Sequence, residues 1–332
     1  MAIVRLHSLR AVTETLSPIP PEEYAKRVLP LTAPLWANGR TFDAYVSQTL
    51  QLARTDYGKR HYQTLGLRSG KTIVASFKRY ERIAWLRSNR LASIGIGAVF
   101  TPPEQRSHGY ASAMLALALD EAKSQRFDFA YLFSDIHPQF YKALGFVELP
   151  SRLISFRADA LSQTRIDVAP LTQKDWPAIR RCFDATQSRR DWGFERGPAF
   201  WKWLQTRIQQ GSEHAGGQAV HLVARRGRGI AAYVFGQREP AHDAYVLDEF
   251  GFSDAKDRGL VAPLLRAAAG DLRKITGWLP PDNVRSLLPR GSVRKRKDAL
   301  LMIAPLSSRG KKFLERAKTT GAADGVWSTD HI

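Results

Sequence analysis

Six consecutive residues in the first half of the chain have the types and order needed to bind an anion. They are Arg106, Ser107, His108, Gly109, Tyr110 and Ala111, between a strand-like and a helix-like segment. The first N–H groups of a helix have no partner within the helix, and the helix dipole is positive there. A glycine in such a turn lets the backbone approach a pyrophosphate, and Arg106 adds a charged donor. Taken alone, the six residues are more typical of a turn that merely starts a helix.

The segments around this turn follow the order of an α/β unit. The strand-like segments are 71–79, 91–101, 127–135 and 151–159, and the helix-like segments are 110–125 and 138–146. Met114, Leu115, Ala118 and Ala122 recur at helical spacing in the longer helix. The shorter helix begins at Pro138 and has a glycine just past its end, as helices commonly do.

The motifs at the two ends of this unit resemble the GCN5-related N-acetyltransferase (GNAT) superfamily. An R-x-x-G-x-A turn follows a V-F-T-P strand end, and the helix F-Y-K-A-L-G-F comes downstream. The residues that carry the resemblance are Val99, Phe100, Thr101, Pro102, Arg106, Gly109, Ala111, Phe140, Tyr141, Leu144, Gly145 and Phe146. The motifs occupy about residues 95–147, and the strand order extends the match across most of the first half. The resemblance implies an α/β (α+β) fold with a mixed, mostly antiparallel central sheet flanked by helices.

The resemblance also implies roles for particular residues. In that family the turn after the fourth strand holds the pyrophosphate of acetyl-CoA, which here assigns cofactor binding to residues 106–111. The end of the strand pairs with the pantetheine arm, here Val99, Phe100 and Thr101. Tyr141 takes the place of a tyrosine that donates a proton or a hydrogen bond to the departing thiolate, with ordinary packing as the alternative. Ser134 stands where many members have an asparagine, so its contact with the cofactor is an open point.

The second half repeats the same order of segments, which predicts two tandem units. Its turn keeps Gly259, but Lys256 replaces the arginine, and Asp254 and Asp257 would repel a pyrophosphate. No tyrosine follows in the corresponding helix. One intact and one degenerate unit are similar to the two acetyltransferase units of the enhanced-intracellular-survival type of acetyltransferase. We therefore expect a cofactor-binding unit at 1–160, a degenerate unit at 161–305, and a C-terminal helix and tail at 306–332.

The strand before the turn contains no acid, so a base for the acceptor amine must come from elsewhere. The C-terminal residues from Trp327 to Ile332 suggest one source. The tryptophan and the isoleucine are unfavourable to leave in water, and Asp330, His331 and the terminal carboxylate could each accept a proton. We predict that this segment folds against the interface of the two units and contributes to the acceptor site. A purely structural anchor is the alternative.

Composition and charge limit the classes of function. Lys and Arg total 50 against 31 acidic residues, for a formal net charge of +19, which attracts anions. A strongly cationic acceptor is disfavoured unless Glu249 or Asp248 makes the pocket locally acidic. The basic cluster at 289–301 has no interleaved aromatic residue, so nucleic acid is possible but not favoured. The histidines do not cluster at metal-ligand spacing, and no metal is expected.

The sequence predicts an acetyl-CoA-dependent N-acetyltransferase that acts on a small-molecule or peptide amine. A non-catalytic acetyl-CoA-binding regulatory module and an aminoacyl-tRNA-dependent transferase are the alternatives. No apolar run is long enough to span a membrane, and residues 1–16 lack the apolar stretch of a signal peptide. A cytoplasmic protein is therefore expected, and its oligomeric state cannot be read from the sequence.

Overall fold

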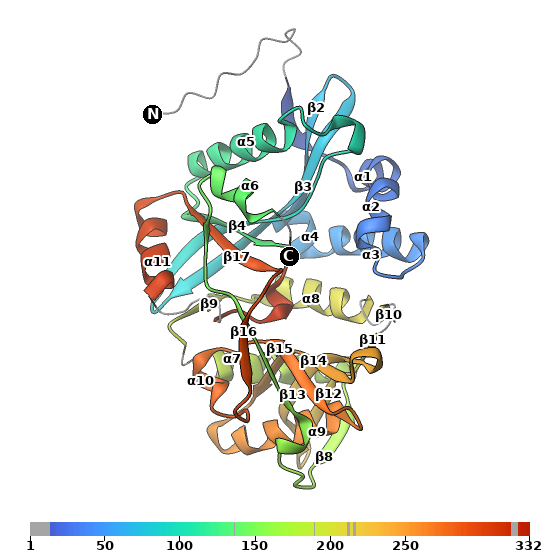
Figure 1. Ribbon diagram of the computed structural model, residues 1–332, viewed down its shortest axis with the longest axis vertical. Coiled ribbons are helices and arrows are strands. Elements are labelled where there is room, and N and C mark those ends of the chain that lie inside the picture. The colour runs from blue at the N-terminus through green and yellow to red at the C-terminus, as the bar shows by residue number, and fades with distance from the viewer. Residues whose placement is uncertain (1–13, 136, 189, 211–212, 215–216, 320–324) are drawn as a thin grey trace.

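The computed structural model describes residues 14–135, 137–188, 190–210, 213–214, 217–319 and 325–332. Most of the N-terminal stretch considered above thus lies outside the described residues. Two mixed β-sheets lie one above the other, each flanked by helices (Figure 1). The predicted α/β fold with two tandem units is confirmed. No helix in the described part of the chain is both long and apolar enough to cross a membrane.

The first sheet has eight strands in the order β1-β2-β3-β4-β5-β17-β6, with β9 added beside β3. Their bounds are β1 Thr15–Pro18, β2 Tyr62–Ser69, β3 Thr72–Leu86, β4 Asn89–Phe100, β5 Phe129–Ser134, β6 Val147–Glu148, β9 Trp192–Phe194 and β17 Leu300–Pro305. The helices of this upper part are α1 Pro21–Arg27, α2 Leu29–Trp36, α3 Phe42–Arg54, α4 Asp56–His61, α5 Tyr110–Ser124, α6 Pro138–Ala143 and α11 Ser308–Thr319.

The second sheet has nine strands in the order β10-β11-β13-β14-β15-β7-β16, with β12 beside β13 and β8 beside β12. Their bounds are β7 Arg152–Arg157, β8 Asp167–Pro170, β10 Glu213–His214, β11 Gly217–Ala219, β12 Leu222–Arg226, β13 Gly229–Glu239, β14 Ala244–Phe252, β15 Lys274–Trp278 and β16 Ser292–Lys295. The helices here are α7 Trp176–Gln187, α8 Pro198–Gln210, α9 Val261–Ala269 and α10 Asp282–Arg285.

The same strand–helix–strand motif forms the centre of each sheet. In the first sheet, α5 connects the parallel strands β4 and β5, and in the second sheet α9 connects the parallel strands β14 and β15. The apolar residues predicted to face inward from α5 are all buried; they are Met114, Leu115, Ala118 and Ala122. The pairing of β4 with β5 stops at Gly95 and Tyr131, although the strands continue to Phe100 and Ser134. The two strands therefore separate toward the start of α5.

Two strands are exchanged between the sheets, contrary to the predicted division of the chain. The segment expected to close the first unit becomes β7, which pairs with β15 and β16 in the second sheet. The segment expected to end the second unit becomes β17, which pairs with β5 and β6 in the first sheet. Neither residue 160 nor residue 305 therefore separates the sheets. Alternating or apolar patterns identify a strand but not its partner, because any sheet edge with a matching face can accept it.

The C-terminal segment folds back between the two units, as predicted. Trp327 is 1% exposed and packs edge-on against Phe250 of β14, with ring centroids 5.1 Å apart. Asp330 accepts hydrogen bonds from Arg82 of β3 at 3.1 Å and from Arg196 at 3.2 Å. The chain then ends its course near the middle of the molecule, where Figure 1 marks the C-terminus. The tail therefore contacts both sheets.

Asp330→Asn should lower the free energy of unfolding by about 3–5 kcal/mol, because it leaves Arg82 and Arg196 buried without their shared carboxylate. Urea unfolding followed by tryptophan fluorescence measures the change. Asp271→Asn, at an exposed acid, is the control and should stay within about 0.5 kcal/mol of wild type. Equal stability of the Asp330 variant and the control would show that this ion pair does not hold the tail.

Candidate active site between the two units

The turn before α5 leaves the start of that helix open to a ligand. Gly109 is the N-cap residue and has φ of +80°, in the left-handed region that favours glycine. It has no side chain to cap the helix, and the first helical hydrogen bond runs from Ala113 N–H to its carbonyl at 3.0 Å. The N–H groups of Tyr110, Ala111 and Ser112 therefore have no capping side chain. Such a helix end is a site for an anion.

The predicted cofactor-binding residues of the turn surround this helix end. Arg106, Ser107, His108 and Gly109 are exposed, and Tyr110 and Ala111 are half-buried. The Nε of Arg106 donates to the carbonyl of Thr101 at 3.2 Å, which holds its guanidinium beside the turn. The rings of His108 and Tyr110 stack with centroids 5.6 Å apart. A Cβ added at Gly109 would meet no protein atom within 4 Å, so the space above the turn is open.

Val99, Phe100 and Thr101 lie at the same end of β4, beyond the point where β5 leaves it. Val99 packs against the apolar cluster under α5, and the Phe100 ring packs against Trp36 at 6.1 Å. Their main chain is therefore placed to pair with an extended ligand. Ser134 is buried at the end of β5, opposite Leu300 of β17.

Tyr141 projects from α6 onto the same apolar cluster that Val99 and Tyr110 contact. Its ring meets Phe140 at 5.0 Å and Phe146 at 6.1 Å between centroids, so packing accounts for part of its role. Burial, with a smaller contribution from the charge of Asp135, raises the pKa of Tyr141 to about 12. The hydroxyl therefore keeps its proton at neutral pH and is suited to donate a hydrogen bond.

The corresponding turn of the second unit is closed by its own carboxylates. Asp254 caps the 3-10 helix Ala255–Leu260 by accepting a hydrogen bond from Lys256 N–H at 3.2 Å. Asp257 is buried and forms an ion pair with Arg226 at 2.8 Å. Negative charge thus already occupies the place that a phosphate would need. The geometry gives a physical reason for the prediction that this turn binds no coenzyme.

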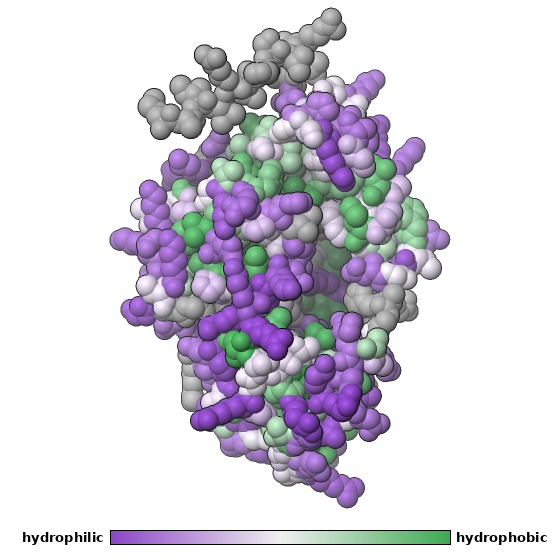
Figure 2. Space-filling model, in the orientation of Figure 1, coloured by the Kyte–Doolittle hydropathy of each residue, from purple (hydrophilic) through white to green (hydrophobic). Residues whose placement is uncertain are grey.

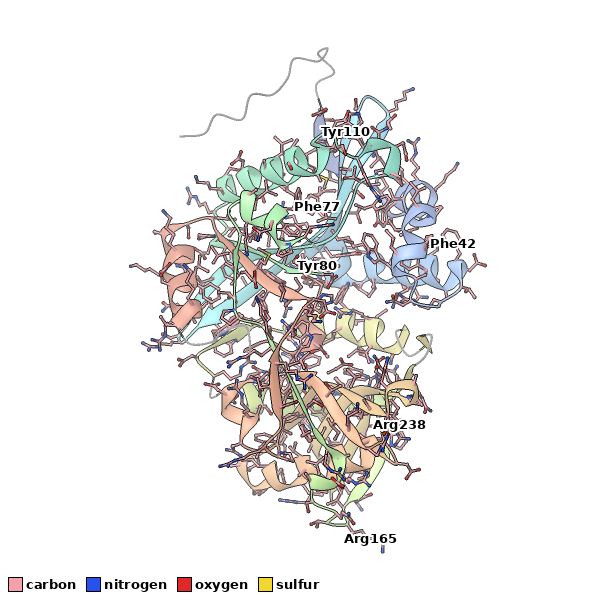
Figure 3. The ribbon with its side chains drawn as sticks, in the orientation of Figure 1. Phe42, Phe77, Tyr80, Tyr110, Arg165 and Arg238 are labelled. Carbon is pink, nitrogen blue, oxygen red and sulfur yellow. The ribbon has the colours of Figure 1, made fainter. Side chains whose placement is uncertain are left out.

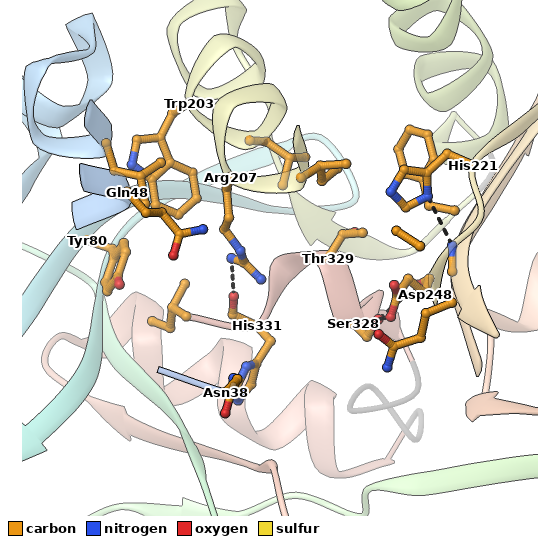
Figure 4. Close-up of a pocket in the computed structure, with 18 of the residues that line it drawn as sticks. Asn38, Gln48, Tyr80, Trp203, Arg207, His221, Asp248, Ser328, Thr329 and His331 are labelled. Atoms are coloured by element: carbon orange, nitrogen blue, oxygen red, sulfur yellow. Dashed lines mark hydrogen bonds between the residues drawn. The ribbon is translucent and has the colours of Figure 1, made fainter. Parts of the chain in front are cut away.

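A cavity of about 420 Å³ lies between the two units. It is bounded by β3, α3, α8, β13, β14 and the C-terminal segment; Figure 2 shows the hollow between the upper and lower halves, and Figure 4 shows the lining. Tyr80 lines it near the junction of the units, whereas Tyr110 lies at the far end of the upper unit (Figure 3). Because residues alternate along β3 and β4, the cavity lies on the face of the first sheet opposite α5.

Two glycines of β4 make room for the tail beside this cavity. A Cβ at Gly95 would lie 2.3 Å from Cδ1 of Ile332, and a Cβ at Gly97 would lie 3.0 Å from its carbonyl carbon. The tail thus reaches β4 where β5 separates from it. Arg207 of α8 donates to the carbonyl of His331, and Ser328 Oγ donates to Asp248 at 2.6 Å.

The acids near the cavity differ sharply in their ability to accept a proton. Burial raises the pKa of Asp248, which lines the cavity, to about 6. Burial would also raise the pKa of Asp330, but the charges of Arg196 and Arg82 outweigh burial and lower it. Glu249 is fully buried and paired with Arg196 at 2.7 Å, so of the two acids named from the sequence only Asp248 makes the pocket acidic. Asp248 is therefore the better proton acceptor.

His331 is a weak base because burial, helped by Arg207 and Arg296, lowers its pKa to about 3. Of the tail residues singled out in the sequence, His331 and Ile332 line the cavity, but His331 binds a proton poorly, and Asp330 is held in ion pairs instead. Among the described residues, no three His, Cys, Asp or Glu side chains are grouped as a metal site.

Sequence reasoning missed the cations Arg40, Lys78 and Arg207 and the glycine pair of β4. The glycines had a visible signal, because G-I-G in a strand places both on one face and leaves space there. The cations gave no such signal, since they come from a loop, a strand and a helix that meet only in the folded chain.

Comparison with known proteins identifies the first unit. Residues 38–148 match the acetyltransferase (GNAT) domain family. A GCN5-related N-acetyltransferase from Anabaena variabilis has a similar structure, with a TM-score of 0.67 and 15% identity over 89% of this chain and 73% of that one. Eis1 from Mycobacterium abscessus gives a TM-score of 0.56 and 11% identity over 89% of this chain and 74% of that one. No curated protein matches the sequence significantly.

N-myristoyltransferase from Saccharomyces cerevisiae with bound myristoyl-CoA is also similar, with a TM-score of 0.56 and 12% identity over 91% of this chain and 81% of that one. At such identities the structural likenesses show the fold, while the family match covers the open turn before α5 and Tyr141. Residues 38–148 thus match the GNAT acetyltransferase domain family, and the chain as a whole has the tandem GNAT fold.

Proposed function

We propose that this protein transfers an acetyl group from acetyl-CoA to the amine of an acceptor. One observation carries the proposal: the uncapped start of α5 lies at the end of a strand whose pairing with β5 stops halfway. The free N–H groups of Tyr110, Ala111 and Ser112, with the exposed Arg106, fit a pyrophosphate. The main chain of Val99–Thr101 fits an extended pantetheine arm. The coenzyme supplies a thioester, whose carbonyl is open to attack by an amine.

A short acyl group suits the cavity better than a long one. The cavity lining includes the charged side chains of Lys78, Arg207 and Asp248. A long apolar chain placed there would cover charged groups without hydrogen-bonding them, which is unfavourable. The yeast N-myristoyltransferase binds myristoyl-CoA, but the charges of this cavity favour acetyl for the present chain.

Two side chains can move or hold the protons of the reaction. The amine forms the new amide bond as the carbon–sulfur bond breaks, so one proton must leave the nitrogen and the thiolate must be stabilised. Asp248, with a pKa of about 6, is ionised at neutral pH and takes the proton. Tyr141 donates a hydrogen bond to the sulfur. Because the pKa of Tyr141 is about 12 and that of an ordinary thiol is about 8.5, complete transfer of the Tyr141 proton to the thiolate is unfavourable.

Gly109→Val should abolish the stabilisation of the protein against heat by acetyl-CoA, because valine is strained at φ of +80° and displaces the backbone that faces the pyrophosphate. Gly70→Val is the matched control: Gly70 has φ of +60°, and a Cβ there also meets nothing. Calorimetry of the wild type should give one site per chain, since Asp254 closes the second turn. Unchanged binding by the Gly109 variant, or two equivalent sites in the wild type, would contradict this assignment.

Tyr141→Phe should lower turnover by about ten- to a thousandfold while acetyl-CoA affinity stays nearly unchanged, because only the donor to the sulfur is lost. Stopped assays of thiol release give the turnover, and calorimetry gives the affinity. Tyr245→Phe removes a buried hydroxyl from the second unit, where it donates to Val220 O at 3.1 Å, and serves as the control. Turnover equal to that of the control would return Tyr141 to a packing role.

The pH dependence of kcat/KM should contain a limb that rises through about pH 6 and then levels off, because Asp248 accepts a proton only when ionised. The hydrogen bond from Ser328 and the charge of Arg207 lower the pKa of Asp248, while Glu249 and Glu239 raise it. Asp248→Asn should remove this limb and lower kcat/KM at pH 7.5 by roughly a hundredfold or more. A limb that persists in the variant would exclude Asp248 as the base.

A variant that ends at Asp330 separates the tail from the base. It keeps Trp327 and the ion pairs of Asp330 but removes His331 and Ile332, the residues next to Gly95 and Gly97. Loss of turnover at an unchanged melting temperature would assign chemistry to these two residues. Turnover close to that of the wild type would show that the tail acts as a structural anchor, which positions Asp248 through the hydrogen bond from Ser328.

A further inference from the structure

The cavity between the units holds three cationic side chains, Arg40, Lys78 and Arg207, here called the cationic cluster. They come from the loop before α3, from β3 and from α8, so the cluster forms only when both units are in place. Lys78 lies directly across from Gly97 in the β3–β4 ladder, which puts its side chain on the glycine face of β4. The cluster therefore faces the region where the tail and the open end of β4 meet.

Lys78 has no anionic partner among the described residues. Its side chain is only partly exposed, and its ammonium lies over the rings of Tyr24 and Tyr62, at 5.6 Å and 5.7 Å from their centroids. Aromatic faces attract a cation but do not neutralise it. A ligand that brings a negative charge into the cavity would therefore find an unneutralised ammonium beside it.

The two arginines of the cluster are bonded only to neutral groups in the part of the chain that the structure describes. Arg207 donates to the carbonyl of His331 and lies 5.6 Å from the Trp203 centroid. Arg40 donates to the carbonyls of Ala37 at 2.7 Å and Trp36 at 3.0 Å, and to the amide oxygen of Gln48. Burial lowers the pKa of both guanidinium groups, which means that each lies in a place unfavourable to its charge.

Little negative charge offsets the cluster. Asp248 is the one acidic side chain that lines the cavity among the described residues, and Ser328 already hydrogen-bonds it. Burial holds the two lining histidines neutral at pH 7, with pKa values of about 4 for His221 and about 3 for His331. Three cationic side chains of the lining thus face one acidic side chain. Such a balance concentrates anions and repels a polycation.

The remaining walls suit a small apolar body. Four aromatic side chains line the cavity; they are Tyr62, Tyr80, Trp203 and Phe235. The volume, about 420 Å³, is in the range of small-molecule sites. A ligand that combines an apolar part with a negative end and a reactive amine would match the aromatic walls, the cationic cluster and Asp248 together.

We propose that the acceptor is a small amino carboxylate, a free amino acid or short peptide, whose carboxylate binds the cationic cluster while its amine faces the open end of β4. This inference depends on the acetyl transfer proposed above and adds the substrate class. It also explains why the charged side chains of a cavity that receives an amine are mainly positive: the carboxylate of the acceptor supplies the missing partner, and Asp248 takes the proton that the amine releases as the amide bond forms.

The test measures coenzyme A release with a panel of free L-amino acids, each paired with its carboxamide, and with spermidine. For the wild type, kcat/KM for the preferred amino acid should exceed that for its carboxamide by at least about tenfold, and spermidine should be a poor acceptor. Lys78→Met keeps the length of the side chain and removes its charge, and it should lower this ratio at least about tenfold through KM. Lys59→Met, at an exposed lysine, is the matched control and should keep the wild-type ratio.

A second measurement does not require turnover. The N-acetylated form of the preferred amino acid should raise the melting temperature of the wild type and of Lys59→Met, but not that of Lys78→Met or Arg40→Gln. The carboxamide of this N-acetylated amino acid should raise the melting temperature of none of the four proteins. Equal use of amino acids and carboxamides, or a preference for spermidine, would overturn the inference and leave acetyl transfer standing. Acetyl-CoA binding with no thiol release from any amine would instead overturn acetyl transfer.

Discussion

The buried carboxylate of Asp330, held between Arg82 and Arg196, is the contact on which the rest of the molecule depends. Arg82 belongs to the first sheet, and Arg196 is tied to Glu249 of the second sheet at 2.7 Å, so one acid closes a chain of charges that crosses the whole interface. The interior is a poor solvent for any of these groups alone, and each is tolerable only because the others are present. Packing of rings reinforces the charges: the Arg196 guanidinium lies 4.0 Å from the Phe183 centroid.

The same contact determines the shape of the cavity. Once Asp330 is fixed, the residues on either side of it have little freedom: Ser328 reaches Asp248, and Ile332 reaches the glycines of β4. The tail thus forms one wall of the cavity and also sets the environment of the acid that we assign as base. A change at the ion pairs would therefore alter both stability and the site, although both carboxylate oxygens of Asp330 already lie against arginines.

Local features of the site could be predicted from the sequence, and non-local ones could not. The turn at 106–111 and the helix that carries Tyr141 are specified by residues a few positions apart, and the structure places them as expected. The burial of the tail was also predictable, because Trp327 is unfavourable to leave exposed to water. The charge state of Asp330 was not, since it depends on two arginines far away in the chain. The exchange of strands could not be predicted for the same reason. The residues of β7 and β17 indicate that each is a strand, but they do not indicate which sheet it joins.

The exchange of β7 and β17 has a consequence for how the chain is made. On the ribosome, the upper sheet lacks β17, one of the two neighbours of β5, until residues 300–305 have left the exit tunnel. Until then, the apolar edge of β5 stays open, and long-range pairing of this kind is slow and prone to misassembly. A protein cut between the units would present the same unfinished edge permanently. Each sheet contains a strand from the part of the chain that otherwise forms the other sheet, so neither half can be separated as an independent domain.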